Sequence, residues 1–290
     1  MVVSFAVACF FQWMAKPLGL EGWLTCGWRA EWFDLTAWKL LIGVAVTTAC
    51  WLAVTFATPC EPESKIASFR EKVAGVKGEA AAKAIGCEFV RCDVSKAADV
   101  QAAVAQCGTV NVLYNNAGIF WTGHDGKITD ISEEDWDRVI AINLKSVYLF
   151  TKYAIPTMIQ AGGGSIVNTG SSAAQIGIPD CDAYTATKGA IVQLTKSLAV
   201  EYGRYGVRTN CISPAAIMTP MMRQSNPENS TFDEERFLKL RTPLRRYGTP
   251  QEIAKIALFL ASDESSYLNG AIIVADGGIT INGDLSKIDT

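Results

Sequence analysis

The stretch 164–201, GSIVNTGSSAAQIGIPDCDAYTATKGAIVQLTKSLAVE, is the part of the chain that decides its fold. The run GSIVNTGSS is short and apolar, follows glycines and ends at two serines, which is typical of a buried strand. A helix is predicted from Ala183 to Glu201, and its Tyr184 and Lys188 stand four residues apart, so both side chains lie on one face. A hydroxyl at a strand end, followed by a phenol and an ammonium on a helix, outlines a proton-transfer site.

The pairing of Tyr184 with Lys188 indicates the chemistry of that site. A free phenol has a pKa of about 10 and is a poor acid near neutral pH. A lysine ammonium beside it favours the phenolate and lowers the pKa toward a working value. Tyr184 is therefore predicted to be a general acid and base, with Lys188 as the group that tunes it.

From about Gly78 onward the chain alternates strand-like and helix-like runs. The further runs read as strands are 87–94 (CEFVRCDV), 110–118 (VNVLYNNAG), 207–214 (VRTNCISP) and 270–278 (GAIIVADGG). Ser132 is predicted to cap a helix whose first turn is acidic, and another helix is predicted at 250–261. This alternation predicts an α/β fold with a parallel sheet and helices on both faces.

Composition excludes several functional classes. The chain has 290 residues and a formal net charge of −3, which gives no electrostatic reason to expect nucleic acid as a partner. Its nine cysteines form no C-x-x-C pair, and Cys87, Cys92 and Cys211 lie in strand-like runs, where cysteine is usually a small buried apolar residue. This favours a reducing compartment over a disulfide framework. The single histidine, His124, lies in a loop-like run without a cluster of metal ligands, so no metal site is predicted.

The start of the chain differs from the rest in being apolar and rich in tryptophan. Residues 1–15 and 40–58 carry no charge, and as a helix the second run would span about 28 Å, close to a bilayer core. Tryptophans flank the two runs and basic residues follow them, which predicts a membrane hairpin with the remainder of the chain in the cytoplasm. In the alternative interpretation, 40–58 is a buried strand and helix of a soluble domain. The predicted domains are an apolar helical segment, 1–76, and a catalytic domain, 77–290.

The run 38–73, WKLLIGVAVTTACWLAVTFATPCEPESKIASFREKV, resembles the C-terminal end of a sodium:solute symporter. The resemblance lies in the TT..W..VTF pattern, the Pro-Glu pair after it and the F-x-x-K-V that follows. A fragment of this length implies no transport, and a transporter subunit is a poor alternative because at most two spans are present.

The residues from about Gly78 to Gly278 resemble a short-chain dehydrogenase/reductase of the type with a Tyr-x-x-x-Lys pair. Five features agree in order and spacing: CDVS at 92–95, NNAG at 115–118, Asn143 in AINLKS, Ser171 thirteen residues before Tyr184, and ISPAAIMTPM at 212–221. The tail 243–278 agrees as well. Tyr-x-x-x-Lys alone occurs by chance in many chains, whereas all of these features in sequence are specific. The resemblance implies a Rossmann-like, doubly wound parallel sheet.

The catalytic roles of the family carry over to four positions. Tyr184 would exchange a proton with the carbonyl or alcohol oxygen, and Lys188 would lower the pKa of the phenol and hydrogen-bond the nicotinamide ribose. Ser171 would hold the substrate oxygen, and its spacing from Tyr184 favours it over Ser172. Asn143 would hold a water that links Lys188 to bulk solvent. The hydride belongs to the cofactor, NAD or NADP, which the protein orients.

The resemblance also implies a set of cofactor-binding residues. At the adenine end these are Asp93 and Val94. Along the rest of the dinucleotide they are Asn116, Ala117, Gly118, Tyr184, Lys188, Pro214, Ile217 and Thr219. Ala215 stands where the family commonly has glycine.

Two parts of the family pattern are missing from the sequence. No T-G-x-x-x-G-x-G turn is found, although the family places the cofactor pyrophosphate on such a turn. The second strand, whose end would choose NAD or NADP, is missing too, so the sheet is expected to lack its usual first two strands. The run Lys39–Thr48 could fill the slot of the first strand, but side chains from Val46 to Trp51 would then crowd the pyrophosphate. Weak or absent dinucleotide affinity is therefore predicted.

Two functions remain open at this point. The first is an NAD(P)-dependent oxidoreductase that moves hydride between the nicotinamide and a small alcohol or ketone. The second is a catalytically silent, membrane-tethered or chimeric remnant, such as a junction of two genes, that keeps the site but binds no dinucleotide. Residues from Met218 to Tyr247 would line the substrate pocket, and such loops vary freely, so the substrate is not defined. The family usually pairs subunits through the helices that carry Asn143 and Tyr184, which implies a homo-oligomer, and membrane contact would run through residues 1–58.

Overall fold

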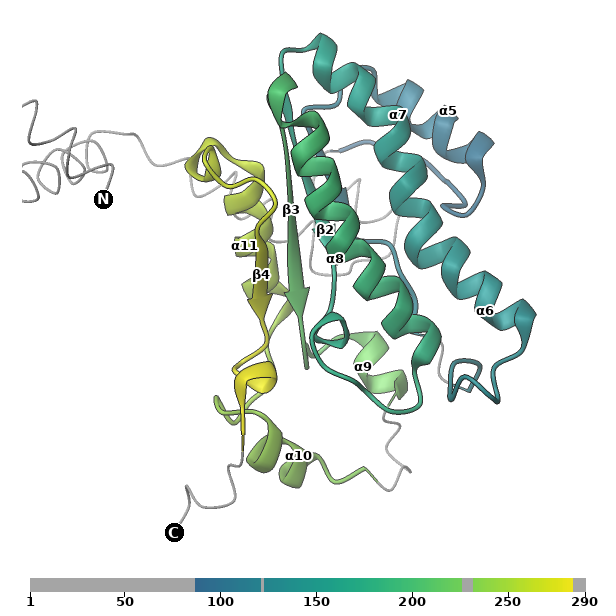
Figure 1. Cartoon of the computed structure of the whole chain (residues 1–290), viewed down its shortest axis with the longest axis vertical. Coiled ribbons are helices and arrows are strands. Elements are labelled where there is room, and N and C mark those ends of the chain that lie inside the picture. The colour runs from purple at the N-terminus through teal and green to yellow at the C-terminus, as the bar shows by residue number, and fades with distance from the viewer. Residues whose placement is uncertain (1–86, 121–122, 226–231, 284–290) are drawn as a thin grey trace, which may run out of the picture. The chain divides into compact units, whose positions relative to one another are not determined.

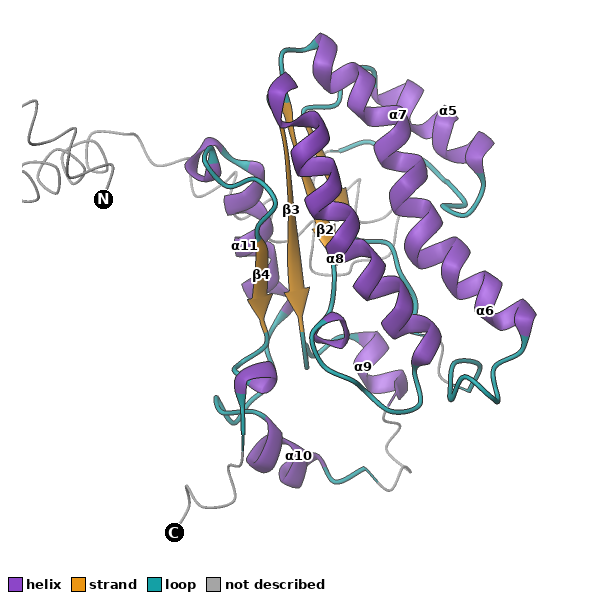
Figure 2. Cartoon of the chain, in the orientation of Figure 1, coloured by secondary structure: helices purple, strands orange, loops and turns teal. Residues whose placement is uncertain are grey.

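The structure of the chain is a computed structural model, and it describes residues 87–120, 123–225 and 232–283. All of these residues belong to one compact unit, Ser64–Thr290. Figure 1 shows how their helices and strands are arranged, and Figure 2 marks the same elements by type.

The described part of the chain contains one sheet of four parallel strands. The strands are β1 (Val112–Asn115), β2 (Gly164–Thr169), β3 (Val207–Pro214) and β4 (Ile272–Ala275), and they lie in the order β1-β2-β3-β4. Their register pairs Asn115 with Asn168, Thr169 with Ile212 and Pro214 with Ala275. The carboxyl ends of the strands therefore meet at one edge of the sheet, where α/β proteins of this kind bind ligands.

Helices connect the strands along the described chain, and one helix precedes β1. The α-helices are α5 (Ala97–Cys107), α6 (Glu133–Ile140), α7 (Ser146–Gln160), α8 (Asp182–Tyr202), α9 (Pro220–Ser225), α10 (Glu234–Arg241) and α11 (Pro250–Ala261). A π-helical segment, η1 (Ala141–Lys145), joins α6 to α7. Short 3-10 turns are η2 (Ser172–Ala174), η3 (Gly203–Tyr205), η4 (Asp263–Ser265) and η5 (Ile279–Ile281).

The sheet is covered on both faces, as the alternation of runs predicts. Successive strand residues point to opposite sides. Ile166 of β2 belongs to a buried cluster with Met158 of α7, whereas its neighbour Val167 belongs to a cluster with Leu260 of α11. Helix α8 packs on β3 beside α7, so α7 and α8 cover one face and α11 covers the other (Figure 1).

A buried chain of polar side chains fixes α8 to the sheet. Asn115 Nδ2 donates to Asn168 Oδ1 at 2.9 Å, and Asn168 Nδ2 donates to Thr195 Oγ1 at 3.0 Å. Thr195 in turn donates to the carbonyl oxygen of Ile191 one turn earlier, at 2.8 Å. Because buried polar groups are costly when unpaired, this chain of bonds holds β1, β2 and α8 in one arrangement.

The helix starts predicted from sequence are confirmed by their caps. Ser132 Oγ accepts the Asp135 N–H at 3.1 Å at the start of α6. Thr249 and Glu252 form a reciprocal capping box at the start of α11, with Pro250 in the first turn. The bounds of β3 and α11 coincide with the predicted runs 207–214 and 250–261.

The prediction of a strand at 87–94 is wrong. Residues 87–93 have no regular structure, Phe89 is 47% exposed, and Cys87 is exposed rather than buried. A strand is stable only beside a partner that takes up its backbone hydrogen bonds, and among the described residues none pairs with this run. Cys211, in contrast, is fully buried in β3 as predicted, and the five cysteines that the structure describes are all free thiols.

The predictions for the start of the chain lie outside the described residues. They are the apolar segment 1–76 with its membrane hairpin, the symporter-like run 38–73, the strand slot at Lys39–Thr48 and the two missing strands of the sheet. Among the residues that the structure does describe, no helix is long and apolar enough to cross a membrane.

Candidate active site

Four residues converge at the carboxyl edge of the sheet: Asn143, Ser171, Tyr184 and Lys188. Ser171 follows the end of β2, Tyr184 and Lys188 lie in the first two turns of α8, and Asn143 lies in η1. Asn143, Ser171 and Lys188 are buried, with 0%, 8% and 4% of their surface exposed. The structure thus brings together the polar groups that the sequence singled out, from three separate parts of the chain.

Ser171 is held in an orientation that leaves its own proton available. Its Oγ accepts the Ala173 N–H at 3.2 Å, which caps the short turn η2. A hydroxyl that accepts one bond can still donate another. The hydroxyl can donate toward Tyr184, and a side-chain hydrogen bond with Ser171 lowers the pKa of the Tyr184 phenol. The structure therefore selects Ser171, rather than Ser172, as the hydroxyl beside the phenol.

Lys188 is a buried amine with one strong anchor. Its Nζ donates to the carbonyl oxygen of Thr169, the last residue of β2, at 2.9 Å. The same nitrogen lies 5.5 Å from the centre of the Tyr184 ring. Burial lowers the pKa of Lys188 to about 8, opposed only in part by the nearby Cys211 thiol. Since an ammonium carries three N–H donors, the bond to Thr169 leaves donors for a ligand such as a ribose hydroxyl.

The pKa of Tyr184 moves in the direction opposite to the one predicted. Burial raises the pKa of its phenol, the bond from Ser171 lowers it, and the Cys181 thiol raises it. The predicted net lowering of this pKa is therefore wrong, because desolvation of the phenolate outweighs the influence that lowers the pKa. The consequence is a phenol that stays protonated at neutral pH and can act as an acid.

Asn143 is fully buried, and its side chain binds the backbone of Ile119. Its Oδ1 accepts the Ile119 N–H at 2.8 Å, and its Nδ2 donates to the Ile119 carbonyl at 2.9 Å. A longer contact, 3.4 Å, joins Nδ2 to Thr187 Oγ1 in α8. The π-helical turn around Asn143 is a feature that is frequent at functional sites, because it turns one side chain away from the regular helix face.

The predicted cofactor-binding residues fall into two groups. The first group lies at the same edge as Tyr184 and Lys188: Asn116, Ala117 and Gly118 follow β1, Pro214 ends β3, and Ile217 and Thr219 follow β3. Asn116 Oδ1 accepts the Thr169 hydroxyl at 3.1 Å, which ties the turn after β1 to the end of β2. Asp93 and Val94 lie in the turn before α5, where Asp93 Oδ1 accepts both the N–H and the hydroxyl of Ser95.

The surroundings of Gly118 show whether the carboxyl edge of the sheet has room for the ribose end of a dinucleotide. A Cβ added at Gly118 would lie 3.4 Å from Asn143 Oδ1 and 3.6 Å from Lys188 Nζ. The missing side chain therefore leaves a space bounded by a carbonyl-type oxygen and an amine, both able to bind a hydroxyl or a water. These residues fit the nicotinamide-ribose half of the cofactor. The residues that hold the pyrophosphate in the family pattern are not found in the sequence.

Gly118→Ala is expected to fold normally and to lose activity. Its methyl group would make ordinary van der Waals contacts, so thermal unfolding should be almost unchanged, but it would fill the space between Asn143 and Lys188. We expect kcat/KM for the reaction at this site to fall on the order of tenfold or more. Steady-state kinetics beside a melting curve check this, with Gly283→Ala, which meets no atom within 4 Å, as the control. An active Gly118→Ala enzyme would show that the space has no role.

Two contacts of Tyr184 could not be found from sequence. The Phe120 ring lies edge-on to the Tyr184 ring, with centroids 5.3 Å apart and planes at 89°. The Asp125 carboxylate accepts the N–H groups of Ala183 and Tyr184. Both partners lie about sixty residues earlier in the chain, and no local pattern in the sequence signals so distant a contact.

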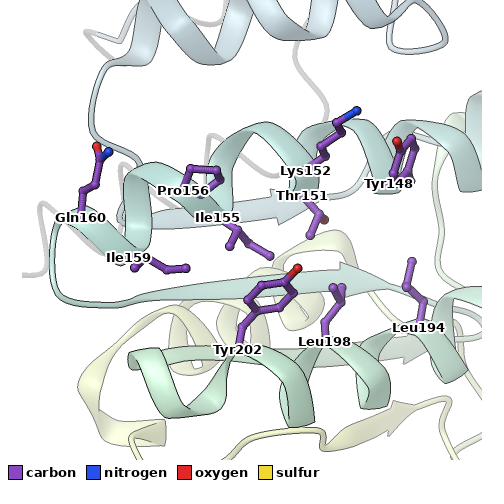
Figure 3. Close-up of a pocket in the computed structure, with 10 residues that line it drawn as sticks. All are labelled: Tyr148, Thr151, Lys152, Ile155, Pro156, Ile159, Gln160, Leu194, Leu198 and Tyr202. Atoms are coloured by element: carbon purple, nitrogen blue, oxygen red, sulfur yellow. The ribbon is translucent and has the colours of Figure 1, made fainter.

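A groove between α7 and α8 lies apart from these polar groups. It has a volume of about 690 Å³ and is lined mainly by apolar side chains, as Figure 3 shows. Ile155, Ile159, Leu194 and Leu198 supply much of the lining, and none of the four convergent residues takes part. The chemistry is therefore assigned to the carboxyl edge of the sheet, where buried titratable groups meet, and not to the groove.

The chain has many relatives among known proteins. Residues 65–280 match the family described as Enoyl-(Acyl carrier protein) reductase. The chain is 42% identical over 199 residues to an uncharacterized oxidoreductase, YxbG, of Bacillus subtilis, covering 66% of this chain and 72% of the relative. It is 40% identical over 194 residues to levodione reductase of Leifsonia aquatica, covering 64% of this chain and 72% of that enzyme.

Solved structures agree with these sequence relatives. The crystal structure of levodione reductase superposes with a TM-score of 0.66 at 34% identity, over 74% of this chain and 93% of that one. A gluconate 5-dehydrogenase from Burkholderia cenocepacia, in complex with NADP and tartrate, superposes with a TM-score of 0.61 at 32% identity, over 66% of this chain and 74% of that one.

Proposed function

The chain belongs to the short-chain dehydrogenase/reductase family and is an NAD(P)-dependent oxidoreductase, and from this premise we propose that it interconverts a small ketone and its alcohol at Tyr184. The observation that carries the proposal is the meeting of the half-buried Tyr184 with the buried Ser171 and Lys188 around one point at the carboxyl edge of the sheet. The alternative function, a catalytically silent remnant, is not favoured, because the relatives are named oxidoreductases and dehydrogenases.

Tyr184 donates the proton in the reducing direction. Because its pKa is raised by burial, the phenol carries its proton at neutral pH. The substrate oxygen takes this proton from Oη while Ser171 Oγ–H donates a second hydrogen bond to the same oxygen. The substrate oxygen gains negative charge in the transition state. Two hydrogen-bond donors directed at it therefore stabilise the transition state more than they stabilise the bound ketone.

Lys188 and Asn143 support that transfer. The Lys188 ammonium, held by Thr169, favours the phenolate that forms when Tyr184 gives up its proton. Lys188 can pass a proton to this phenolate, and a water in the space beside Gly118, which Asn143 borders, can then return a proton to Lys188. When bound, the nicotinamide supplies or accepts the hydride. Its ribose hydroxyl fits the remaining donors of Lys188.

The coenzyme is NAD or NADP, and we propose that it binds weakly. A glycine-rich turn is needed where the backbone approaches a pyrophosphate, and the sequence offers none. The edge residues Asn116, Gly118 and Lys188 would then supply most of the binding, on the nicotinamide side. The substrate is proposed to be a small alcohol or ketone, the class to which the named substrates of the relatives point.

We also propose that the chain forms a homo-oligomer through the groove between α7 and α8. The groove presents apolar side chains on two parallel-lying helices, and Tyr148 at its end is 49% exposed (Figure 3). Paired helices of a second copy would cover this surface, which is the arrangement that the family resemblance implies.

Turnover by the purified full chain tests the proposed function. Cyclohexanone, butane-2,3-dione and hydroxyacetone are offered in turn with NADH and with NADPH, and coenzyme absorbance is followed. We expect ketone-dependent oxidation of one coenzyme, with an apparent KM for that coenzyme above the micromolar range. Failure of both coenzymes with every ketone would contradict the proposal, and a micromolar coenzyme KM would contradict weak binding.

A further inference from the structure

The start of α8 is capped by a distant residue and not by its own N-cap. The residue at the N-cap position, Cys181, makes no side-chain capping bond. Asp125 supplies the cap instead: its Oδ1 accepts the Ala183 N–H at 3.1 Å and its Oδ2 accepts the Tyr184 N–H at 2.8 Å. The Asp182 N–H donates to the carbonyl of Gly126 at 3.1 Å. The three N–H groups that open the helix are thus all paired with residues 125 and 126.

The same loop is tied to the helix in the reverse direction as well. Asp182 Oδ2 accepts the Ile128 N–H at 2.8 Å, so each segment caps a backbone group of the other. Earlier in the loop, Asn143 holds Ile119 through both of its amide atoms. The Phe120 ring then packs edge-on against Tyr184. Ile119, Phe120 and residues 125–128 therefore contact the proton-transfer site, or the first turn of the helix that carries it, at more than one point.

This cap matters for Tyr184 more than for Lys188. Tyr184 is the third residue of α8, and the first turn of a helix opens easily when its N–H groups lack partners. Lys188 lies one turn deeper, is 4% exposed and is anchored independently on Thr169. Loss of the cap would leave the amine in place and release the phenol.

We propose that Asp125 is a positioning residue that fixes the first turn of α8 and so holds the Tyr184 hydroxyl at the substrate oxygen. The bonds that its carboxylate makes go to the backbone N–H groups of Gly126, Ala183 and Tyr184. It acts through two backbone bonds to the residues that carry the phenol, and its negative charge suits the positive end of the helix dipole. The proposal rests on the proposed role of Tyr184 in proton transfer.

Backbone hydrogen exchange tests the cap without any substrate. In Asp125→Ala the amides of Ala183 and Tyr184 lose their acceptors, and we expect their exchange to become roughly 5- to 30-fold faster, the effect of losing a strong cap. Asp125→Asn keeps one acceptor oxygen and should give an intermediate change. Asp130→Asn removes the same charge from the same loop without touching α8, and should leave both amides unchanged. Unaltered exchange in Asp125→Ala would overturn the proposal.

Kinetic measurements test whether the cap positions the Tyr184 phenol for proton transfer. With the best substrate of the ketone panel, we expect kcat of Asp125→Ala to fall about tenfold or more while the KM for the ketone changes little. A second readout is the Tyr184 phenol titration, taken as the ultraviolet difference between each protein and its Tyr184→Phe version. In Asp125→Ala the phenol should titrate at lower pH, since an opened first turn is less buried.

The outcomes separate this proposal from the proposed function. Faster exchange and a lower phenol pKa in Asp125→Ala support the positioning role even if the wild-type chain reduces no ketone. An active wild-type enzyme whose Asp125→Ala variant keeps full kcat and the same phenol titration would overturn it. If Asp125→Ala shows no cooperative thermal unfolding, the same measurements are made on Asp125→Asn. An unchanged kcat and an unchanged phenol titration in Asp125→Asn would then count against the proposal.

Discussion

Tyr184→Phe is expected to lower kcat for ketone reduction by about 10²- to 10⁴-fold, the contribution typical of a positioned general acid. The change removes one oxygen and keeps the ring that packs edge-on against Phe120. The Michaelis constant for the ketone should change little, because the lost interaction is strongest when charge develops on the substrate oxygen. Steady-state turnover with the best ketone of the panel measures the effect.

A matched tyrosine serves as the control for this change. Tyr205 is 40% exposed in the turn η3, at the opposite end of α8 from the active site. Tyr205→Phe should therefore retain the kcat of the wild type. If Tyr184→Phe kept more than about a tenth of the wild-type kcat, the phenol would not be the acid and the assignment would fail.

Lys188→Met is expected to abolish most activity and yet to stabilise the fold. The amine that favours the Tyr184 phenolate is lost, so kcat should again fall about 10²-fold or more. Methionine fills a similar space without a buried charge. Burial holds the pKa of Lys188 at about 8, against an ordinary value of about 10.4. The charged amine thus lowers the free energy of unfolding by on the order of 3 kcal/mol at most.

The sign of this effect fixes its pH dependence. The unfolded chain holds the proton of Lys188 more tightly than the native chain, so the cost of burial is complete below pH 8 and disappears as pH rises toward about 10.4. The methionine variant lacks the hydrogen bond to Thr169, and this loss lowers its free energy of unfolding by about 1 kcal/mol. We expect its melting temperature to exceed that of the wild type by roughly 2–6 °C at pH 7, with the gap closing at alkaline pH.

Differential scanning calorimetry across that pH range checks the stability half of the prediction. Lys196→Met, an exposed lysine two turns further along α8, should change neither activity nor the pH dependence of melting. Ketone reduction by the wild type should decline above about pH 8 as Lys188 loses its proton while Tyr184, whose pKa is raised, keeps its own. A Lys188→Met variant less stable than the wild type at pH 7 would contradict the claim that the buried charge of Lys188 destabilises the fold.

Much of the fold followed from local patterns because each element carries its own signals. The run 207–214 is apolar enough to be a buried strand, and it forms β3 with the same bounds. The Thr249-Pro250 pair and Glu252 mark the start of α11, where the structure has a capping box. The four-residue spacing of Tyr184 and Lys188 placed both side chains on one helix face.

The features that sequence did not predict depend on distant partners. The run 87–94 is as apolar as β3, yet it forms no strand because no described strand lies beside it. The raised pKa of Tyr184 depends on burial beneath the loop that follows β1, and the capping of α8 by Asp125 joins residues about sixty positions apart. Such contacts exist only after the chain has folded, so no local pattern can indicate them.

Transfer of isotope from coenzyme to product tests the central claim most directly. Reduced coenzyme that carries deuterium at both C4 positions of the nicotinamide is incubated with the purified chain and the ketone that it turns over, and the alcohol is examined by mass spectrometry. The account predicts one deuterium on the carbinol carbon, formed by the wild type and nearly absent with Tyr184→Phe. Alcohol formed without deuterium, or formed equally well by Tyr184→Phe, would contradict it.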